Sequence, residues 1–271
     1  MKNIKPKILI PRGLGINSHE ELKYVFELAG AEVDFILWND LINNPNILNN
    51  YQGAGLAGGF AMGDSLGAGQ SLANRIKDPG FIYKFKEKIE DEKFLIYSVC
   101  NSLQTMAKLD LLPGKIGTMQ NDSGKHETLM WDIKINYKNK SVWLKYLKDY
   151  PGPVFAPISH GEGKIFLDEE NLKIIQDRNI VALTYTQGYI CNEFESSRGN
   201  RYNPNGSTAN IAGLAWKGNL LLFPHFERFH HNFQRHDRHK LKEYEKNKEG
   251  LYLPTYLMFK SAVEEMCKHI K

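Results

Sequence analysis

The chain has 271 residues and a net charge of +4, and 42% of its residues are apolar. These values fit one large globular domain with a sizeable core, and they exclude a disordered or low-complexity chain. The N-terminus runs directly into a strand-like segment at 7–10, and no apolar run is long enough to span a bilayer. We therefore expect a cytoplasmic protein without a membrane segment. The modest charge neither requires nor excludes an anionic partner, and we expect no nucleic acid.

The three cysteines are an odd number and have no metal-ligand spacing. They are Cys100, Cys191 and Cys267. They provide no disulfide framework, so a reducing compartment is the simpler assumption and one of them can be a lone reactive thiol.

Short apolar runs alternate with amphipathic stretches in the first half of the chain. The expected elements are a strand at 7–10, a helix opened by a capping box at 18–21, a strand at 33–38, a Gly-rich loop at 58–69, a strand at 94–99 and a helix from Asn101 to about Leu112. This alternation predicts an α/β fold with a mainly parallel central sheet and helices on both faces.

The second half is less regular. Its strand candidates are 131–137, 154–158, 180–185, 211–216 and 220–223. Gly218 and Asn219 between the last two indicate a hairpin. There is no internal repeat and no Pro/Ser-rich linker, so we expect a single domain over 1–271. A charged and partly helical C-terminal extension begins at about residue 229.

Cys100 stands between the predicted strand at 94–99 and the helix that follows it. A nucleophile at such a turn is lifted clear of the sheet, and the N-terminus of the helix favours a thiolate. A free cysteine at a strand end is more often a small buried apolar residue. Cys100 by itself therefore does not establish a catalytic site.

Two other segments carry groups that a thiol nucleophile needs. Gln104 lies one helical turn after Cys100 on the same face, where it can hold a polar ligand. Far downstream, the strand at 220–223 leads into His225 and Glu227. Residues i and i+2 of an extended segment point to one side, so Glu227 can orient His225 while His225 takes the thiol proton. A His-x-Glu pair is a weak signal when it occurs alone.

The combination resembles the class I (triad) glutamine amidotransferases, in which Cys-Asn-x-x-Gln follows a strand and Pro-His-x-Glu-Arg comes late. The segments 58–69, 158–163 and 203–207 are, in addition, similar to the glutaminase subunit of phosphoribosylformylglycinamidine synthase. The last two read Ile-Ser-His-Gly-Glu-Gly and Asn-Pro-Asn-Gly-Ser. The likeness runs from about Pro6 to Arg228 and implies a flavodoxin-like domain.

The resemblance implies catalytic roles for the matching positions. Cys100 would be the nucleophile, His225 the acid and base, and Glu227 the residue that orients it. The backbone N–H groups of Gly59 and Asn101 would form an oxyanion hole. Glycine suits position 59 because the main chain must come close to the substrate without a Cβ in the way.

The resemblance also implies a substrate site. Gln104 and the main chain near Ser159 and Gly161 would hold the α-amino and carboxylate groups of glutamine. His160, in the same loop, would contact this end of the substrate rather than act as the base.

The activity implied is hydrolysis of glutamine, with transfer of the ammonia to a synthetase subunit. That partner would use ATP and Mg to convert formylglycinamide ribonucleotide to the amidine in purine biosynthesis, together with a small accessory subunit. This chain would need no cofactor and no metal. His236 and His239 are one helical turn apart, but a basic helix that faces solvent or a partner is the favoured interpretation of that segment.

Three other interpretations stay open. The chain could be a cysteine peptidase or an unrelated amidase, or the glutaminase of another amidotransferase. It could also be a regulatory relative that has lost turnover, because Ser98 and Ser102 stand where the family has glycine and Phe226 where it has proline. Alanine at position 57 replaces another common proline. None of these replacements removes a chemical group that the reaction needs.

Overall fold

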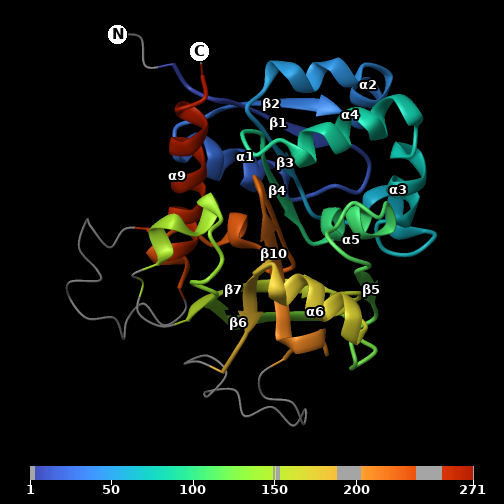
Figure 1. The fold of residues 1–271 in the computed structure, drawn as a ribbon, viewed down its shortest axis with the longest axis vertical. Helices are drawn as coiled ribbons and strands as arrows, with labels where there is room; N and C mark the ends of the chain where they lie inside the picture. Colours follow the sequence, from blue (N-terminus) through green and yellow to red (C-terminus); the bar gives the residue numbers. More distant parts are fainter. Residues whose placement is uncertain (1–3, 149, 151–152, 188–202, 236–251, 271) are drawn as a thin grey trace.

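The computed structural model describes residues 4–148, 150, 153–187, 203–235 and 252–270 (Figure 1). A nine-stranded sheet has the order β2-β1-β3-β4-β11-β10-β9-β6-β7, and β5 pairs with β8 in a separate small sheet. The strands are β1 (Lys7–Arg12), β2 (Glu32–Leu37), β3 (Gly53–Leu56), β4 (Leu95–Val99), β5 (Gly117–Met119), β6 (Glu127–Ile135), β7 (Val154–His160), β8 (Lys164–Phe166), β9 (Val181–Tyr185), β10 (Ile211–Trp216) and β11 (Asn219–Leu222).

The α-helices and 3-10 helices lie between and after these strands. The α-helices are α1 (His19–Leu28), α2 (Trp38–Asn43), α3 (Gln70–Ile76), α4 (Pro79–Glu90), α5 (Asn101–Lys108), α6 (Glu169–Asp177) and α9 (Pro254–Cys267). The 3-10 helices are η1 (Pro45–Asn50), η2 (Ala61–Asp64), η3 (Val142–Leu147), η4 (Thr208–Asn210), η5 (Phe226–Arg228) and η6 (Asn232–Gln234). No helix in these described ranges is long and apolar enough to cross a bilayer.

The sheet confirms the α/β prediction and divides into a parallel and an antiparallel part. β2, β1, β3, β4 and β11 run parallel to one another. From β11 through β10, β9 and β6 to β7, every pairing is antiparallel. The predicted hairpin is the point of change. Lys217, with a φ of 50°, and Gly218 connect β10 to β11, and a connection this short can join only antiparallel strands.

Helices cover both faces of the parallel part of the sheet. α1 and α9 pack together on one face, and α2 with α4 and α3 with α5 pack on the other (Figure 1). The sequence did not predict β3, whose Gly-Ala-Gly-Leu lacks the usual β-branched residues. The glycines serve the packing of helices. A Cβ on Gly53 would lie 2.8 Å from Met266 of α9, and one on Gly55 would lie 2.9 Å from Leu22 of α1.

Two sequence predictions need correction at helix ends. The Ser18 side chain caps nothing in α1, because its hydroxyl accepts a hydrogen bond from the Gly58 N–H at 2.9 Å and so ties the start of the helix to the Gly-rich loop. α5 ends at Lys108 rather than near Leu112, because Asp110 adopts a φ of 56° and turns the chain out of the helix. Cys191 and the segment 236–251 of the predicted extension lie outside the described residues.

The final helix contributes directly to the core. Phe259 of α9 is fully buried, and its ring lies 5.2 Å from that of Phe26 in α1 and 4.9 Å from that of Tyr97 in β4. Aromatic rings at these separations contribute both buried area and edge contacts. The last stretch of the chain is therefore part of the packing around the central strands.

A Phe259→Ala substitution should destabilise the protein by about 3–5 kcal/mol, because it leaves a cavity between α9 and the sheet. Urea unfolding followed by circular dichroism would measure the change. Tyr83→Ala is the matched control, since Tyr83 is 75% exposed and its truncation should cost no more than about 0.5 kcal/mol. Equal stabilities of the two variants would contradict the role of α9 in the core.

Candidate active site

Cys100 occupies a sharp turn between β4 and α5. Its backbone has φ 53° and ψ −110°, a conformation that costs a non-glycine residue free energy and is found at nucleophile elbows. The surrounding strands hold it there. Its N–H donates to the Leu222 carbonyl of β11 at 2.8 Å, and its Sγ lies 3.6 Å from the Ser159 carbonyl. The strand–Cys–helix turn predicted from the sequence is therefore present.

The two serines beside the elbow fit into it. The Ser102 hydroxyl donates to the Ala57 carbonyl at 2.6 Å and so joins α5 to the start of the Gly-rich loop. Ser98 is fully buried in β4, and its hydroxyl has no hydrogen-bond partner within the described ranges. The turn thus tolerates a Cβ at both positions where glycine is common in the resembling family.

His225 and Glu227 follow β11, the strand next to β4, and form a buried pair. His225 Nδ1 lies 2.6 Å from Glu227 Oε1, and the two side chains are 3% and 0% exposed. The other Glu227 oxygen, Oε2, accepts a hydrogen bond from the Tyr97 hydroxyl at 3.0 Å. His225 also forms a side-chain hydrogen bond with Cys100. The structure therefore brings the predicted thiol, imidazole and carboxylate into one chain of contacts.

The environment makes this pair ionic. Burial by itself lowers the pKa of His225, but the charge of Glu227 and the hydrogen bonds with Cys100 and Glu227 raise it to about 10. Burial opposes ionisation of Glu227 as well, yet the charge and hydrogen bond of His225 hold the pKa of this carboxyl below its ordinary value. Tyr97 keeps its proton, because burial and the nearby Glu227 raise its pKa well above the usual range.

His160 has the opposite character. It is 2% exposed, and its ring packs edge-on against Phe223 at 5.3 Å. Burial lowers its pKa to about 3, and the charge of His225 adds to this effect. A Cβ on Gly163 would lie 2.1 Å from its Nδ1, so only glycine fits beneath the ring. Of these two histidines, only His225 is placed to carry a proton at neutral pH.

The Gly-rich loop places Gly59 against the loop that follows β1. Gly59 has a φ of +147°, and a Cβ there would lie 2.4 Å from the Gly15 carbonyl oxygen. The neighbouring Phe60 N–H donates to that carbonyl at 2.8 Å. The N–H groups of Gly59 and Asn101 have no acceptor in the part of the chain that the structure describes. Both of the predicted oxyanion donors are therefore free to bind a ligand.

The Asn101 side chain connects the first turn of α5 to the same loop. Its Oδ1 accepts from the Ala61 N–H at 3.1 Å, and its Nδ2 donates to Asp64 at 3.0 and 3.1 Å. The amide also donates to Gln104 Oε1 at 3.0 Å. Asn101 thus positions the loop and a predicted substrate residue through its side chain, while its backbone N–H remains free.

The predicted substrate residues lie around one loop. Gln104 is 3% exposed, and its Nε2 donates to the Glu162 carbonyl at 2.9 Å. Ser159 is at the end of β7, and its hydroxyl lies 3.0 Å from Nε2 of His126. The Gly161 carbonyl accepts from the Asn121 N–H at 2.9 Å.

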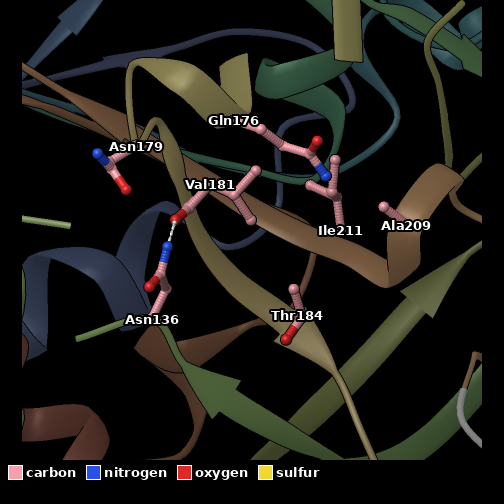
Figure 2. A pocket seen from close by; sticks show the side chains of 7 residues that line it. All are labelled: Asn136, Gln176, Asn179, Val181, Thr184, Ala209 and Ile211. Carbon is pink, nitrogen blue, oxygen red and sulfur yellow. Dashed lines mark hydrogen bonds between the residues drawn. The ribbon is translucent and has the colours of Figure 1, made fainter. Parts of the chain in front are cut away.

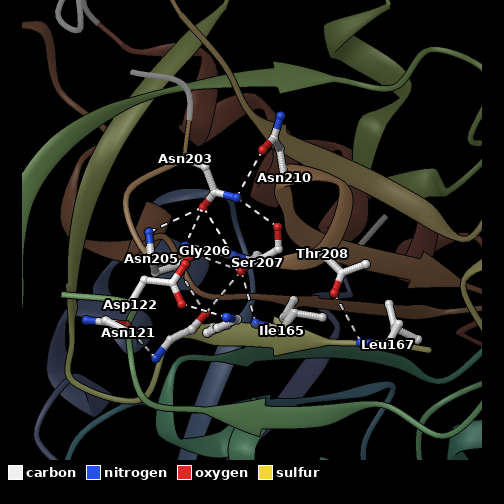
Figure 3. Close-up of polar contacts among 12 residues, drawn as sticks. Asn121, Asp122, Ile165, Leu167, Asn203, Asn205, Gly206, Ser207, Thr208 and Asn210 are labelled. Carbon is white, nitrogen blue, oxygen red and sulfur yellow. Dashed lines mark hydrogen bonds and ion pairs between the residues drawn. The ribbon is translucent and has the colours of Figure 1, made fainter. Parts of the chain in front are cut away.

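A network of amide and hydroxyl side chains forms hydrogen bonds with the main chain of this loop, residues 160–163 (Figure 3). Asn121 donates to the His160 carbonyl at 2.7 Å and accepts from the Gly163 N–H at 3.0 Å. Asn205 donates to the Gly163 carbonyl at 2.7 Å and, through Oδ1, lies 2.7 Å from Oγ of Ser207. Residues far apart in the sequence therefore determine the shape of the loop beside Cys100.

Sequence reasoning missed two of these supporting residues. Tyr97 offered a signal, since a tyrosine inside a fully buried strand needs a partner for its hydroxyl. Asn121 offered none, because it lies in an irregular segment with no recognisable pattern. The motif at 203–207 was noticed, but only the structure gives it contacts.

No group of three or more histidine, cysteine, aspartate or glutamate side chains within the described ranges could hold a metal ion. His236 and His239, which had suggested such a site, lie outside those ranges.

A family model described as a CobB/CobQ-like glutamine amidotransferase domain matches residues 5–264. The chain belongs to this family of glutamine amidotransferases. Subunit PurQ of phosphoribosylformylglycinamidine synthase from Methanococcus maripaludis strain C7 is 31% identical over 97% of this chain and 98% of its own length. The corresponding subunit from Dehalococcoides mccartyi is 34% identical over 83% of this chain and 86% of its own length.

Solved structures share the fold. The structure of PurLQS from Thermotoga maritima includes a chain that is 22% identical, with a TM-score of 0.65 over 99% of this chain and 100% of that one. A glutamine amidotransferase from Thermotoga maritima is 14% identical, with a TM-score of 0.53 over 98% of this chain and 99% of that one. These likenesses support the α/β fold.

Replacing Glu227 by glutamine should lower the pKa of His225 from about 10 to its ordinary value of 6.5 or below, because burial remains while the negative charge is lost. An NMR titration of the imidazole nitrogens would measure this. Glu90→Gln, which alters an exposed carboxylate, is the control and should leave the His225 pKa unchanged. A His225 pKa that stays near 10 in Glu227→Gln would contradict the ionic pair.

The same pair should give stability a defined pH dependence. The raised pKa of His225 stabilises the fold fully below pH 6.5, and this contribution is lost as the pH rises to about 10. The lowered pKa of Glu227 stabilises the fold above its ordinary 4.5, and this contribution is lost at more acid pH. The wild-type free energy of unfolding should therefore exceed that of Glu227→Gln most between about pH 4.5 and 6.5.

Proposed function

We propose that the chain is the glutaminase subunit of a phosphoribosylformylglycinamidine synthase and hydrolyses glutamine to glutamate and ammonia. The observation that carries this proposal is the contact chain of Cys100, His225 and Glu227 at the ends of neighbouring strands. The names of its relatives, which are subunits of that synthase, support the choice of reaction. The residue roles below belong to the same proposal.

The first half of the reaction forms a thioester. In the resting site, the proton of the Cys100 thiol has already passed to His225, which is protonated at neutral pH, and the thiolate attacks the side-chain carbonyl carbon of glutamine. The carbonyl oxygen becomes an oxyanion that the N–H groups of Gly59 and Asn101 stabilise, each by on the order of two to three powers of ten in rate. When the C–N bond breaks, the nitrogen takes the proton from His225 and leaves as ammonia.

The second half releases glutamate. A water molecule gives a proton to His225 and attacks the thioester carbon, which forms a second oxyanion in the same place. The C–S bond then breaks, and the Cys100 sulfur recovers the proton from His225. Glu227 stabilises the imidazolium in both halves, and Tyr97 holds Glu227 in position through the hydrogen bond to Oε2.

The Gln104 side chain and the main chain near Ser159 and Gly161 hold the α-amino and carboxylate groups of the substrate. The names of its relatives favour a glutaminase over a cysteine peptidase. Release of glutamate from glutamine, with no cleavage of peptides that contain glutamine, would separate the two functions.

The ammonia passes to a synthetase subunit, with a small accessory subunit completing the complex. ATP, Mg and formylglycinamide ribonucleotide belong to the synthetase, so this chain requires no cofactor of its own. A relative named as one subunit of a synthase supports such a division of labour. Co-purification of this chain with a synthetase that makes the amidine would support this assignment. Glutaminase activity coupled to another synthetase would show instead that the chain serves a different amidotransferase.

Cys100→Ala should abolish glutamine-dependent synthesis of the amidine by the complex, while external ammonia still supports it, because the variant lacks only the nucleophile. A glutamine-mimicking diazo ketone should label wild-type Cys100, located by peptide mass spectrometry. Cys267→Ala is the control and should be labelled and active like the wild type, since Cys267 lies in α9. Absence of labelling even with the synthetase present would favour the regulatory relative without turnover.

Gly59→Ala should reduce kcat by on the order of two to three powers of ten, because the new Cβ collides with the Gly15 carbonyl and displaces one oxyanion donor. Steady-state glutaminase kinetics would measure the loss. Gly30→Ala is a suitable control. Gly30 also has a positive φ, +105°, but a Cβ there has nothing within 4 Å, so the variant should retain wild-type kcat. A fully active Gly59→Ala protein would rule out this donor.

A further inference from the structure

A cavity of about 410 Å³ lies between the C-terminal ends of β1 and β2, the start of η2, and α3. Its volume is within the range of small-molecule sites. Arg12, His19, Trp38, Asn39 and Arg75 contribute its polar lining. The geometry points to this cavity as a second ligand site that binds a small molecule bearing a phosphate group, separate from the glutamine site.

The position of the cavity in the sheet supports ligand binding. The chain leaves β1 in one direction to form β2 and later returns to the other side of β1 to form β3. In an open α/β sheet, the crevice at such a reversal, here between β1 and β3, is a common ligand site, and Ala61 and Met62 after β3 line this cavity. Arg12 is the last residue of β1, and Trp38 follows β2 directly.

The charge of the lining selects an anion. Arg12 and Arg75 are exposed at the rim, and neither has a carboxylate partner among the described residues. Arg75 Nε donates to Asn39 Oδ1 at 2.9 Å, which orients the guanidinium and leaves its terminal N–H groups free. No aspartate or glutamate lines the cavity in the described part of the chain. Arginine pairs of this kind bind phosphate oxygens through two N–H groups each.

A buried donor deeper in the cavity also lacks an acceptor. Trp38 is 5% exposed, and its indole N–H has no hydrogen-bond partner within the described ranges. The neighbouring ring atom Cδ1 would lie 3.5 Å from a Cβ on Gly13, so this edge of the indole faces the loop that lines the cavity. A buried donor without a partner is energetically unfavourable, and a ligand oxygen that accepts from it would remove that cost.

A second cavity, of about 210 Å³ beside β9 and β10, differs from the first in the charge of its lining (Figure 2). Its polar lining consists of amide and hydroxyl groups without a charged side chain, and Asn136 there already donates to the Val181 carbonyl at 2.7 Å. The larger cavity has two arginines without a carboxylate partner among the described residues, although the Arg12 guanidinium lies over the Phe35 ring at 5.4 Å. It also has a buried unpaired donor, and the smaller cavity has neither feature.

Backbone hydrogen bonds connect the lining of the proposed site to the loop that contains Gly59. Leu14, Ile16 and Met62 line the cavity. The Met62 N–H donates to the Leu14 carbonyl at 2.9 Å, and Ile16 forms an isolated β-bridge with Gly59. A ligand that fills the cavity would therefore stabilise the loop that carries the proposed oxyanion donor. This consequence rests on the proposed function, whereas the binding itself does not.

Isothermal titration calorimetry on the full chain, with inorganic phosphate, pyrophosphate and AMP as probes, tests the binding. We expect one molecule of at least one probe to bind per chain. The Arg12→Gln/Arg75→Gln double variant should bind it at least about tenfold more weakly, because the charged hydrogen bonds to the phosphate are lost. Arg178→Gln, which removes an exposed arginine after α6, is the matched control and should bind like the wild type.

Hydrogen exchange gives a readout that is independent of glutaminase activity. The ligand should slow exchange at the Phe60 and Met62 amides, and Trp38→Phe should weaken binding while the variant keeps its wild-type unfolding temperature. No binding of any probe at about 10 mM, or binding that the arginine substitutions leave unchanged, would overturn the proposal. A change in Trp38 fluorescence with the synthetase subunit but with none of the probes would also overturn it, in favour of a protein contact.

Discussion

The parallel pairing of β4 with β11 is the constraint on which the rest of the site depends. Val99 and Leu222 are partners in this register, and the Cys100 N–H donates to the Leu222 carbonyl at 2.8 Å. The carboxyl ends of two neighbouring parallel strands lie at one edge of the sheet, so the turn with Cys100 and the segment with His225 must leave the sheet side by side. A shift in this register would separate thiol and imidazole without changing either residue.

A second constraint is the ion pair in the interior. A buried charge is costly unless a partner and further hydrogen bonds compensate for it, and Glu227 has both, in His225 and Tyr97. Phe226 between the two is fully buried. The extended segment predicted here is instead the 3-10 helix η5, whose turn still brings His225 and Glu227 together. Packing from β4 and β11 thus keeps both charged groups in the geometry that the proposed reaction needs.

The glycine-rich loop connects three regions of the molecule. Ser18 accepts from Gly58 at the start of α1, Asn101 binds Ala61 and Asp64 from α5, and Gly15 contacts Gly59 closely. The loop is therefore held from the β1 side and from the elbow at once. This arrangement explains why small residues occupy it, because a side chain on the inner face would meet another backbone. Ile16, which lines the cavity beyond β1 and β2, pairs with Gly59 of this loop.

Much of the fold and the candidate site could be predicted from the sequence, because apolar runs and residue spacing indicate individual strands, helices and turns. The apolar run before Cys100 and the helix after it indicated the elbow, and the spacing of His225 and Glu227 indicated that both point to one side. The sequence did not predict β3, because its glycines are required by close contacts with side chains of α1 and α9, which are distant in the sequence. Apart from the hairpin at Gly218 and Asn219, the antiparallel pairing of the second half could not be predicted, since strand direction depends on neighbours rather than on the strand itself.

The sequence by itself therefore determined which groups are available: one thiol at a turn, one imidazole and carboxylate two residues apart, and a loop of glycines. Only the tertiary structure decided their chemistry. Burial and the contact with Glu227 hold a proton on His225, whereas burial without such a partner removes it from His160. The physical reason is that a pKa depends on solvent and on charges brought close in space, and neither is encoded by the identity of a single residue.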